Sequence, residues 1–407
     1  MTRRTFLAAA TALRRGQVRR ELFLRSPAPG TAVMAQAYYT RRSGGEMMSI
    51  EQRFSRSDTV DVAYYRFSRD FGASWSPPEE RSTGEKRPDG MLRRHPRGCF
   101  LDRKTGRLLE FWVEGVLPHD DPLEGMKQWN VFYQIGREKT AHQVIQHGAG
   151  FDARHPLPGV FTGRNMVMLG DVASVPITVG NSVLVPAIVT PLDAGGQLYN
   201  PTKGYTYTDA IVLHGTWKGH RLVWHASEPI SGDPKRSTRG LDEPTIEQLK
   251  DGRLVLVLRG SNSSIATLPG YRWVSYSDDG GLRWSKPQPW TFSNGNPFFS
   301  PSACSQLLRH SNGKLYWLGH ITATNPRGNR PRYPLYVAEV AEDSGTPVAD
   351  KLIKVDDRQP GDDETLMIYS IYAREDRQTN EIAIQASRIV TPGGVFGGDA
   401  MLYRVTV

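Results

Sequence analysis

Cysteine is almost absent from this chain of 407 residues, which contains only Cys99 and Cys304. Two thiols so far apart in sequence exclude a disulfide framework and a four-ligand zinc site, so we expect two buried thiols. Long apolar runs are also missing. The longest lies within Phe6 to Leu13 and is far shorter than the roughly 20 residues that a membrane span needs. We therefore do not expect a membrane protein.

Continuous basic stretches are absent from the body of the chain. There are 51 Lys and Arg against 42 Asp and Glu, a net charge of +9, but the basic residues cluster only within positions 1–25. Without a basic stripe or a recognisable reading motif, nucleic acid is not an expected partner. The dispersed charge fits a solvated surface or an anionic small substrate.

The N-terminus resembles a twin-arginine export signal. Arg3 and Arg4 precede a short apolar run of small residues, which two further arginines follow at once. We predict a leader over residues 1–26 and export to the periplasm or the cell exterior. The alternative is a disordered basic tail on a cytoplasmic protein.

Turn-forming residues are abundant, with 40 Gly and 28 Pro, and short runs of Val, Ile, Leu, Tyr and Trp lie between them. Such runs between Gly-, Asn- and Asp-rich turns favour strands over long helices. The chain is predicted to be mostly β.

One pattern, a turn containing Gly or Asn followed by a mainly apolar run, returns six times. The turns lie at 44–45, 105–106, 180–181, 251–252, 312–313 and 379–380, roughly 60 to 75 residues apart. This spacing accommodates four short strands, and each turn fits a hairpin between an inner strand and its neighbour. We predict an all-β, six-bladed β-propeller of four-stranded antiparallel blades, formed as a single domain by residues 27–407. Two stacked β-sandwiches would not explain a period that persists along the chain.

Two segments share the pattern Ser-x-Asp-x-Gly-x-x-Trp, one from Ser68 to Trp75 and the other from Ser277 to Trp284. The Asp carboxylate can accept backbone N–H bonds within a turn that the Gly permits, and the Trp packs back onto the blade. These segments resemble the Asp boxes of the sialidase (neuraminidase) superfamily, which mark the outer hairpins of propeller blades. Their role is structural, so they support the fold more than a function.

The run from Leu241 to Arg259 places Glu243 and Arg259 at the outer ends of one predicted hairpin. It resembles the sialidase segment that carries the catalytic Glu and the second arginine of a carboxylate-binding triad. In the first unit, Arg53 and Asp58 precede the first Asp box, as an arginine and the acid/base Asp do in sialidases. The resemblance implies a pocket role for Arg53 and an acid/base role for Asp58.

Tyr369, in the run Met367 to Ile371, matches the sialidase nucleophile. A phenol has a pKa near ~10 and needs a carboxylate to take its proton, and the resemblance supplies Glu243 for that step. A phenol also suffers less repulsion from an anionic sugar than a carboxylate would. For the third arginine Arg332 fits best, with Arg330 and Arg327 as rivals.

Two departures from the sialidase pattern concern the substrate. Residues 31–35 contain no arginine where the first triad arginine is expected, and Gln385 stands where its partner carboxylate is expected. His95 and Arg97 are candidates to replace the lost contacts. A missing cation together with a neutralised anion suggests a remodelled pocket.

The resemblance therefore implies a retaining exo-glycoside hydrolase that acts on a terminal acidic sugar of a glycan, sialic acid or a related one, without metal or organic cofactor. A non-catalytic glycan-binding propeller is one alternative. A lyase acting on an anionic polysaccharide is the other.

Overall fold

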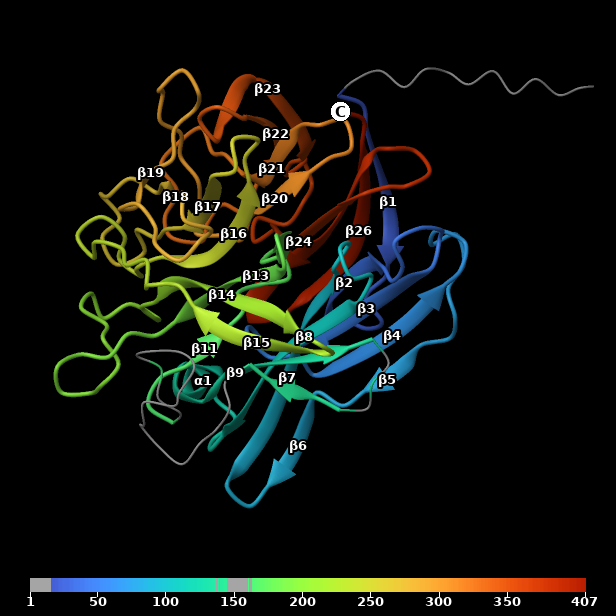
Figure 1. Ribbon diagram of the computed structural model, residues 1–407, viewed down its shortest axis with the longest axis horizontal. Helices are drawn as coiled ribbons and strands as arrows, with labels where there is room; N and C mark the ends of the chain where they lie inside the picture. Colours follow the sequence, from blue (N-terminus) through green and yellow to red (C-terminus); the bar gives the residue numbers. More distant parts are fainter. Residues whose placement is uncertain (1–15, 137, 139, 145–159, 161–162) are drawn as a thin grey trace, which may run out of the picture.

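The computed structural model describes residues 16–136, 138, 140–144, 160 and 163–407, and these form an almost entirely β structure (Figure 1). Helix in this part of the chain is limited to the 3-10 turns η1 (Pro122–Glu124) and η2 (Pro392–Gly394) and the short α1 (Gly125–Gln128). The prediction of a β protein is therefore confirmed.

The described strands form five sheets, of eight, five, five, four and four strands. Dividing the eight-stranded sheet between β26 (Gly397–Val405) and β2 (Ala32–Tyr39) gives six groups of four antiparallel strands, here called units I to VI. Unit I consists of β2, β3 (Met47–Phe54), β4 (Val62–Ser68) and β5 (Glu79–Arg81). Unit II consists of β7 (Gly90–Leu101), β8 (Leu108–Leu117), β9 (Asn130–Ile135) and β10 (His142–Gln143). Unit III consists of β11 (Val167–Met168), β13 (Ser182–Val189), β14 (Asp209–Lys218) and β15 (Arg221–Ala226). Unit IV consists of β16 (Asp242–Gln248), β17 (Leu254–Arg259), β18 (Arg272–Ser277) and β19 (Gln288–Pro289). Unit V consists of β20 (Gln306–Arg309), β21 (Leu315–His320), β22 (Leu335–Ala341) and β23 (Thr346–Asp356). Unit VI consists of β24 (Met367–Glu375), β25 (Ile382–Val390), β26 and β1 (Val18–Leu24). Two further strands, β6 (Gly84–Arg87) and β12 (Ile177–Val179), pair with β7 and β13.

The six turns found in the sequence lead directly into the second strand of each unit, namely β3, β8, β13, β17, β21 and β25. Each turn contains a residue with positive φ, which Gly and Asn adopt more readily than other residues: Gly44, Gly106, Gly180, Gly252, Gly313 and Asn380. The repeat read from the sequence is therefore the repeat of the fold.

Buried apolar clusters lie between consecutive units. Leu109 of unit II packs in one cluster with Val185 of unit III, and Leu184 of unit III packs in another with Leu256 of unit IV. Further clusters join units IV and V, V and VI, VI and I, and I and II. Units VI and I also share one eight-stranded sheet, through a bridge between Ala32 and Gly398.

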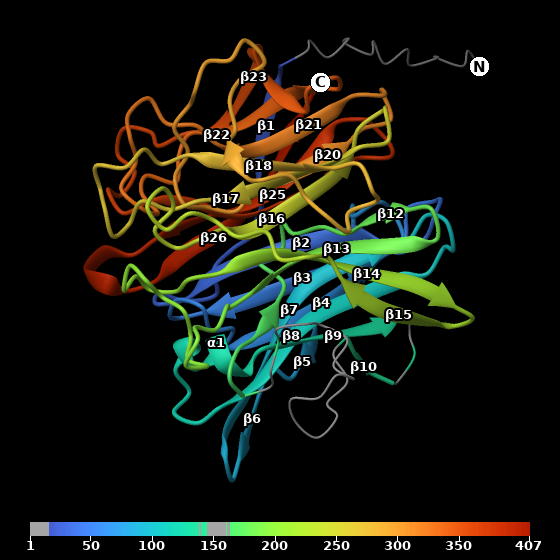
Figure 2. The same ribbon diagram turned by 60° about the vertical axis from the view of Figure 1, so that its left-hand side comes forward.

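The two ends of the described chain meet in unit VI. Strand β1 pairs antiparallel with β26, with Val18 opposite Val405. Figure 1 shows β1 beside β26, and in Figure 2 the blue start of the described chain and the C-terminus lie at the same end of the molecule. The N-terminal strand and the C-terminal run therefore belong to the same unit. This pairing corrects the predicted boundary, because the domain begins before residue 27 and a strand lies inside the predicted leader. The twin-arginine segment, at residues 1–15, lies outside the described residues.

The two Ser-x-Asp-x-Gly-x-x-Trp segments form turns between the third and fourth strands of units I and IV. Asp70 Oδ1 accepts hydrogen bonds from the Ser74 amide (2.9 Å) and the Ser68 hydroxyl (2.7 Å), and Asp279 Oδ1 accepts one from the Arg283 amide (3.0 Å). Hydrogen bonds from Ser74 and then Ser68 lower the pKa of Asp70 to about 2. Both carboxylates thus close a turn, as the sequence predicts.

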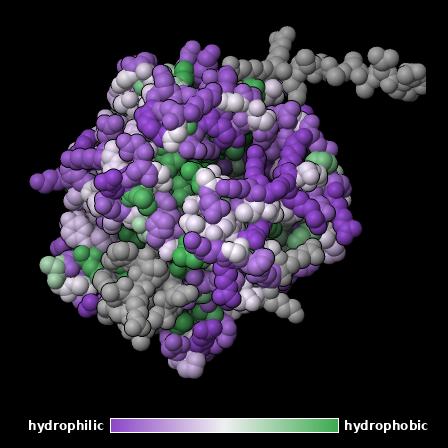
Figure 3. Space-filling view, viewed as in Figure 1, coloured by the Kyte–Doolittle hydropathy of each residue, from purple (hydrophilic) through white to green (hydrophobic). Residues whose placement is uncertain are grey.

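Charged and polar side chains cover most of the face drawn in Figure 3. Cys99 and Cys304 are buried and unpaired, as expected. None of the described helices is long and apolar enough to cross a membrane.

Candidate active site

Glu243 and Arg259 meet at one end of unit IV, where β16 begins and β17 ends. The antiparallel register sets Asp242 opposite Arg259, and Arg259 Nη1 lies 2.7 Å from Glu243 Oε1. Burial by itself raises the pKa of Glu243, but the charge of Arg259 and its hydrogen bond outweigh burial, so the pKa lies below its usual value. The two residues therefore form a buried ion pair in which Glu243 is ionised.

Tyr369 on β24 lies beside Arg332, which comes just before β22. The guanidinium carbon of Arg332 is 4.3 Å from the centroid of the Tyr369 ring. Ser302 joins the two arginines, because its hydroxyl accepts from Arg259 Nε at 2.8 Å and its carbonyl accepts from Arg332 Nη2 at 3.2 Å. Units IV, V and VI therefore converge on this point.

Of the three candidates for the third arginine, the structure brings Arg332 to the tyrosine. Arg330 Nη1 donates instead to the carbonyl of Thr365 at 3.2 Å, and Arg327 is joined to Arg330 by a backbone bridge.

A hydrogen bond between the Tyr369 hydroxyl and the Glu243 carboxylate is expected if Glu243 takes the phenol's proton. Among the described residues no such bond joins the two side chains. Glu243 Oε1 is bound by Arg259, and Oε2 has no partner in the described protein. The role of Glu243 as acceptor of the phenol's proton stays a prediction.

Asp58 follows β3 and is tied to the same end of the fold through Tyr205. Its Oδ2 accepts a hydrogen bond from the Tyr205 hydroxyl at 3.2 Å. The guanidinium carbon of Arg239 lies 5.6 Å from the Tyr205 ring centroid, and Arg239 Nη2 is 3.9 Å from Asp242 Oδ2. The exposed loop of unit I is thereby linked to the Glu243–Arg259 pair.

Backbone strain is concentrated at these residues. Positive φ values occur at Asp58 (56°), Glu243 (39°) and Ser370 (54°), which are three of the seven non-glycine residues with positive φ in the described chain. The register of β16 shifts at Glu243 and that of β24 shifts just after Tyr369. Such bulges and strained residues cluster at sites where a side chain is re-aimed for function.

Arg97, from β7 of unit II, also belongs to this cluster. Its Nε donates to the carbonyl of Leu169 at 3.3 Å. Burial lowers the pKa of Arg97, and the groups whose charges oppose this lowering are, in order, Asp171, Tyr369, Asp58 and Glu243. Arg97 of unit II therefore contacts the segment whose Gly170 packs against Glu243.

His95 is placed in the interior. It is 3% exposed, its ring centroid lies 4.9 Å from that of Trp129, and the Val60 amide donates to its Nε2 at 3.4 Å. Burial, followed by the charges of Arg97 and Arg93, lowers the pKa of His95 well below its usual value. A neutral ring packed in this way is a core group.

Arg53 and Gln385 are not brought to the tyrosine. Arg53 Nε donates to Glu51 at 2.6 Å, and its guanidinium carbon lies 4.5 Å from the Tyr64 ring centroid. Gln385 is fully buried, and its Oε1 accepts from the Ala37 amide at 2.6 Å. Gln385, which was predicted to contact the substrate, thus makes a hydrogen bond that joins units VI and I.

Asp171 is the residue of this cluster that the sequence reasoning missed. It lies in segment 169–175, where Val172 packs with side chains of units I, II and VI and Ala173 packs with units V and VI. A Cβ on Gly170 would lie 2.9 Å from Glu243 Cγ of unit IV. The sequence feature that could have identified Asp171 is its position as the one charged residue in the otherwise apolar stretch from Val167 to Ala173.

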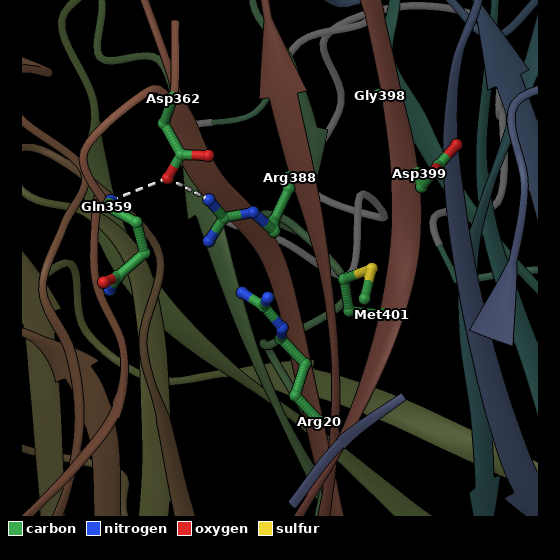
Figure 4. A pocket seen from close by; sticks show the side chains of 7 residues that line it. All are labelled: Arg20, Gln359, Asp362, Arg388, Gly398, Asp399 and Met401. Atoms are coloured by element: carbon green, nitrogen blue, oxygen red, sulfur yellow. Dashed lines mark hydrogen bonds and ion pairs between the residues drawn. The ribbon is translucent and has the colours of Figure 1, made fainter. Parts of the chain in front are cut away.

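A separate surface pocket of about 520 Å³ lies beside β1 and β26 (Figure 4). Its two arginines are already paired. Arg388 lies 2.6 Å from Asp356 and also contacts Asp362, and Arg20 lies 3.4 Å from Asp356. This pocket is therefore lined by a structural ion-pair network.

In the part of the chain that the structure describes, no group of three or more His, Cys, Asp or Glu side chains could hold a metal ion. No protein-family model and no curated protein matches the sequence.

Several solved structures match the fold. A protein of unknown function from Dyadobacter fermentans DSM 18053 gives a TM-score of 0.59 at 15% identity, over 95% of this chain and 99% of that chain. The NanB sialidase from Streptococcus pneumoniae gives 0.57 at 12% identity, over 95% and 70%. The alpha-L-arabinanase from Penicillium chrysogenum, complexed with arabinobiose, gives 0.55 at 13% identity, over 95% and 97%. The chain shares the fold of these proteins.

Proposed function

We propose that the six units close into a six-bladed β-propeller with the site at one end of its axis. Buried clusters join each pair of consecutive units, including unit VI with unit I, and this supports a closed ring. The contacts of segment 169–175 with units I, II, IV, V and VI fit a position on the axis.

We propose that the protein is a glycoside hydrolase that removes a terminal acidic sugar, sialic acid or a related one, from a glycan. The observation that carries this proposal is the convergence of Tyr369, Arg332, Arg259 and Glu243 from three units. Guanidinium groups bind carboxylates through paired hydrogen bonds, and a phenol is a suitable nucleophile beside an anionic group. The fold shared with a sialidase and an arabinanase supports a glycan substrate.

In the proposed reaction the Tyr369 hydroxyl oxygen bonds to the anomeric carbon as its proton passes to the ionised Glu243, whose Oε2 has no partner among the described residues, while Asp58 protonates the leaving oxygen. Asp58 then takes a proton from the water that displaces Tyr369, and Tyr369 regains its own proton from Glu243. Two displacements at the same carbon retain the anomeric configuration. Neither a metal nor an organic cofactor enters this scheme.

The arginines available to a substrate anion are Arg97 and Arg332. Arg259 is paired with Glu243, whereas the hydrogen bonds that Arg97 and Arg332 make within the described chain go to backbone carbonyls, those of Leu169 and Ser302. One charged contact fewer than in a three-arginine site costs roughly 1.5–3 kcal/mol, on the order of ten- to a hundredfold in binding. We therefore expect slow cleavage of ordinary sialosides and faster cleavage of another acidic sugar.

The test is a screen of the purified protein against aryl glycosides of sialic, ulosonic and uronic acids and of α-L-arabinofuranose, with the product anomer followed by NMR. Release of the aryl group with retention of configuration supports the proposal. Tight glycan binding without turnover would favour a non-catalytic propeller. An unsaturated sugar product from an anionic polysaccharide would favour a lyase.

A further inference from the structure

Tyr205, in the loop before β14, places an exposed aromatic ring beside Asp58. The residue is 53% exposed, and its hydroxyl donates to Asp58 Oδ2 at 3.2 Å. A tyrosine whose hydroxyl is hydrogen-bonded while its ring faces solvent offers an apolar surface to a ligand, and few side-chain torsions need to be fixed on binding. The loop of unit III therefore brings a binding surface to the residue proposed as the acid.

The loop that carries Tyr205 is held by contacts on both sides of the ring. Asn200 Nδ2 donates to the Gly204 carbonyl at 2.7 Å, and a Cβ on Gly204 would lie 3.5 Å from Arg239 Cγ. Arg239 also donates to the hydroxyl of Thr206. Its guanidinium carbon lies over the Tyr205 ring, 5.6 Å from the centroid. Arg239 thus covers one face of the ring, and a ligand would meet the other face.

The two carboxylate oxygens of Asp58 differ in their partners. Oδ2 accepts from the Tyr205 hydroxyl at 3.2 Å and from the Ser57 hydroxyl at 3.1 Å, whereas no hydrogen bond from the described chain reaches Oδ1. Hydrogen bonds to a carboxylate stabilise its charged form, which is the form that remains when an acid has given up its proton. The two donors on Oδ2 therefore leave Oδ1 to carry the proton.

The Tyr205 phenol is suited to remain a donor. Burial of part of the residue, then the charge of Asp58 and the hydrogen bond to it, raise the pKa of Tyr205 above its usual value. The phenol therefore keeps its proton over the pH range in which a glycosidase works.

The leaving sugar of a glycan lies against the acid that protonates its oxygen. Sugar rings carry an apolar face of C–H groups, which is removed from water when it packs on an aromatic ring. On its other side the Tyr205 ring is linked to unit IV, because Arg239 lies 3.9 Å from Asp242, the residue before Glu243. The ring is thus joined to Asp58 on one side and to the buried charges of the site on the other.

We propose that Tyr205 forms the subsite for the leaving sugar of the proposed glycosidase. Its ring packs on the apolar face of that sugar, and its hydroxyl is a positioning group that holds Asp58 with Oδ1 toward the glycosidic oxygen. As the bond from the anomeric carbon to this oxygen breaks, its electron pair stays on the oxygen, which takes the proton from Asp58 Oδ1. The hydrogen bond from Tyr205 stabilises the carboxylate that forms. In the second half this carboxylate takes the proton of the attacking water.

This inference rests on the proposed function, so its test compares two substrates of the wild type. The first joins galactose, as the leaving sugar, to the acidic sugar that the wild type releases fastest. The second is the glycosyl fluoride of the same acidic sugar. Fluoride offers no ring to Tyr205 and leaves with little need of a proton, so it bypasses both contributions.

Two variants separate the hydroxyl from the ring. Tyr205→Phe keeps the ring and removes the donor, so kcat on the galactose conjugate should fall about five- to tenfold further than on the fluoride, the effect of one hydrogen bond, with KM little changed. Tyr205→Leu also removes the ring. It should in addition raise KM for the galactose conjugate about fivefold, the effect of losing roughly 40 Å² of apolar contact. Circular dichroism checks the folding of both variants.

The matched control is Tyr199→Phe. Tyr199 lies in the same connection between β13 and β14, is 37% exposed, and packs edge to face on Tyr207 with ring centroids 5.2 Å apart. No contact within the described chain joins it to Asp58. Tyr199→Phe is therefore expected to match the wild type on both substrates.

The outcomes distinguish the subsite from the proposed function. Equal losses on the two substrates in Tyr205→Phe, or an unchanged KM for the galactose conjugate in Tyr205→Leu, would overturn the inference while leaving the glycosidase proposal intact. If the wild type cleaves neither substrate, the proposed function fails and the subsite fails with it.

Discussion

Replacing Arg259 by Met is expected to destabilise the fold strongly, because two buried carboxylates lose the positive charge beside them. Arg259 Nη1 lies 2.7 Å from Glu243 and 3.8 Å from Asp242, and both side chains are only 11% exposed. Removing one partner of a buried ion pair costs about 3–5 kcal/mol, since the remaining charge keeps its desolvation penalty. Domains of this kind have only about 5–15 kcal/mol in total, so much of the stability would be lost.

A double-mutant cycle separates the pair from its surroundings. Glu243→Gln leaves Arg259 with Asp242 and with its 2.8 Å hydrogen bond to Ser302, so we expect a cost of about 1–3 kcal/mol. The double variant removes both charges and should be more stable than the sum of the single effects predicts, by at least about 1.5 kcal/mol. Urea unfolding followed by tryptophan fluorescence gives the three free energies. Additivity within about 0.5 kcal/mol would refute the ion pair as the dominant interaction of Glu243.

Three further predictions concern the rest of the molecule. Gln385→Met should lower the free energy of unfolding by about 1–3 kcal/mol, because the buried Ala37 amide loses its acceptor, and should leave KM unchanged; a KM effect at intact stability would return Gln385 to the substrate pocket. Asp279→Ala should cost about 1 kcal/mol, comparable to the loss of a helix cap, and leave turnover unchanged; reduced turnover in the folded variant would show that this turn is not purely structural. Burial, followed by the charges of Arg332 and Arg272, lowers the pKa of His320 to about 3. Between that value and the unfolded pKa of about 6.5 only the unfolded chain binds the proton, so His320 should lower the free energy of unfolding by about 1.4 kcal/mol for each unit by which the pH is lowered. His320→Asn should lack this contribution to the slope. Equal slopes in the wild type and the variant would contradict this.

The repeat of the fold was predictable because it is written into local sequence. The turn before each second strand needs a residue that accepts positive φ, so Gly or Asn recurs at a near-constant spacing. The Glu243–Arg259 pair was predictable for a similar reason, since the two residues close the ends of a single hairpin. Local turn chemistry and strand alternation carry this kind of information.

The errors arose where packing between distant segments decides the outcome. Strand β1, VRRELFL, reads as a charged tail, yet an outer strand can expose its charges, and Arg19 pairs with Glu381 at 2.7 Å. Gln385 reads as a polar pocket residue, but its partner is a backbone amide of another unit. Asp171 has no local motif at all, because its neighbours come from several different units.

We propose Tyr369 as the nucleophile of a retaining glycosidase. The most direct measurement is the turnover of Tyr369→Phe on the aryl glycoside that the wild type cleaves fastest, with folding checked by circular dichroism. Phe keeps the ring that packs against Arg332 and removes only the attacking oxygen. Tyr369→Phe should fold, still bind the sugar and lose more than about 99% of turnover. Wild-type turnover with retained configuration in this variant would contradict it.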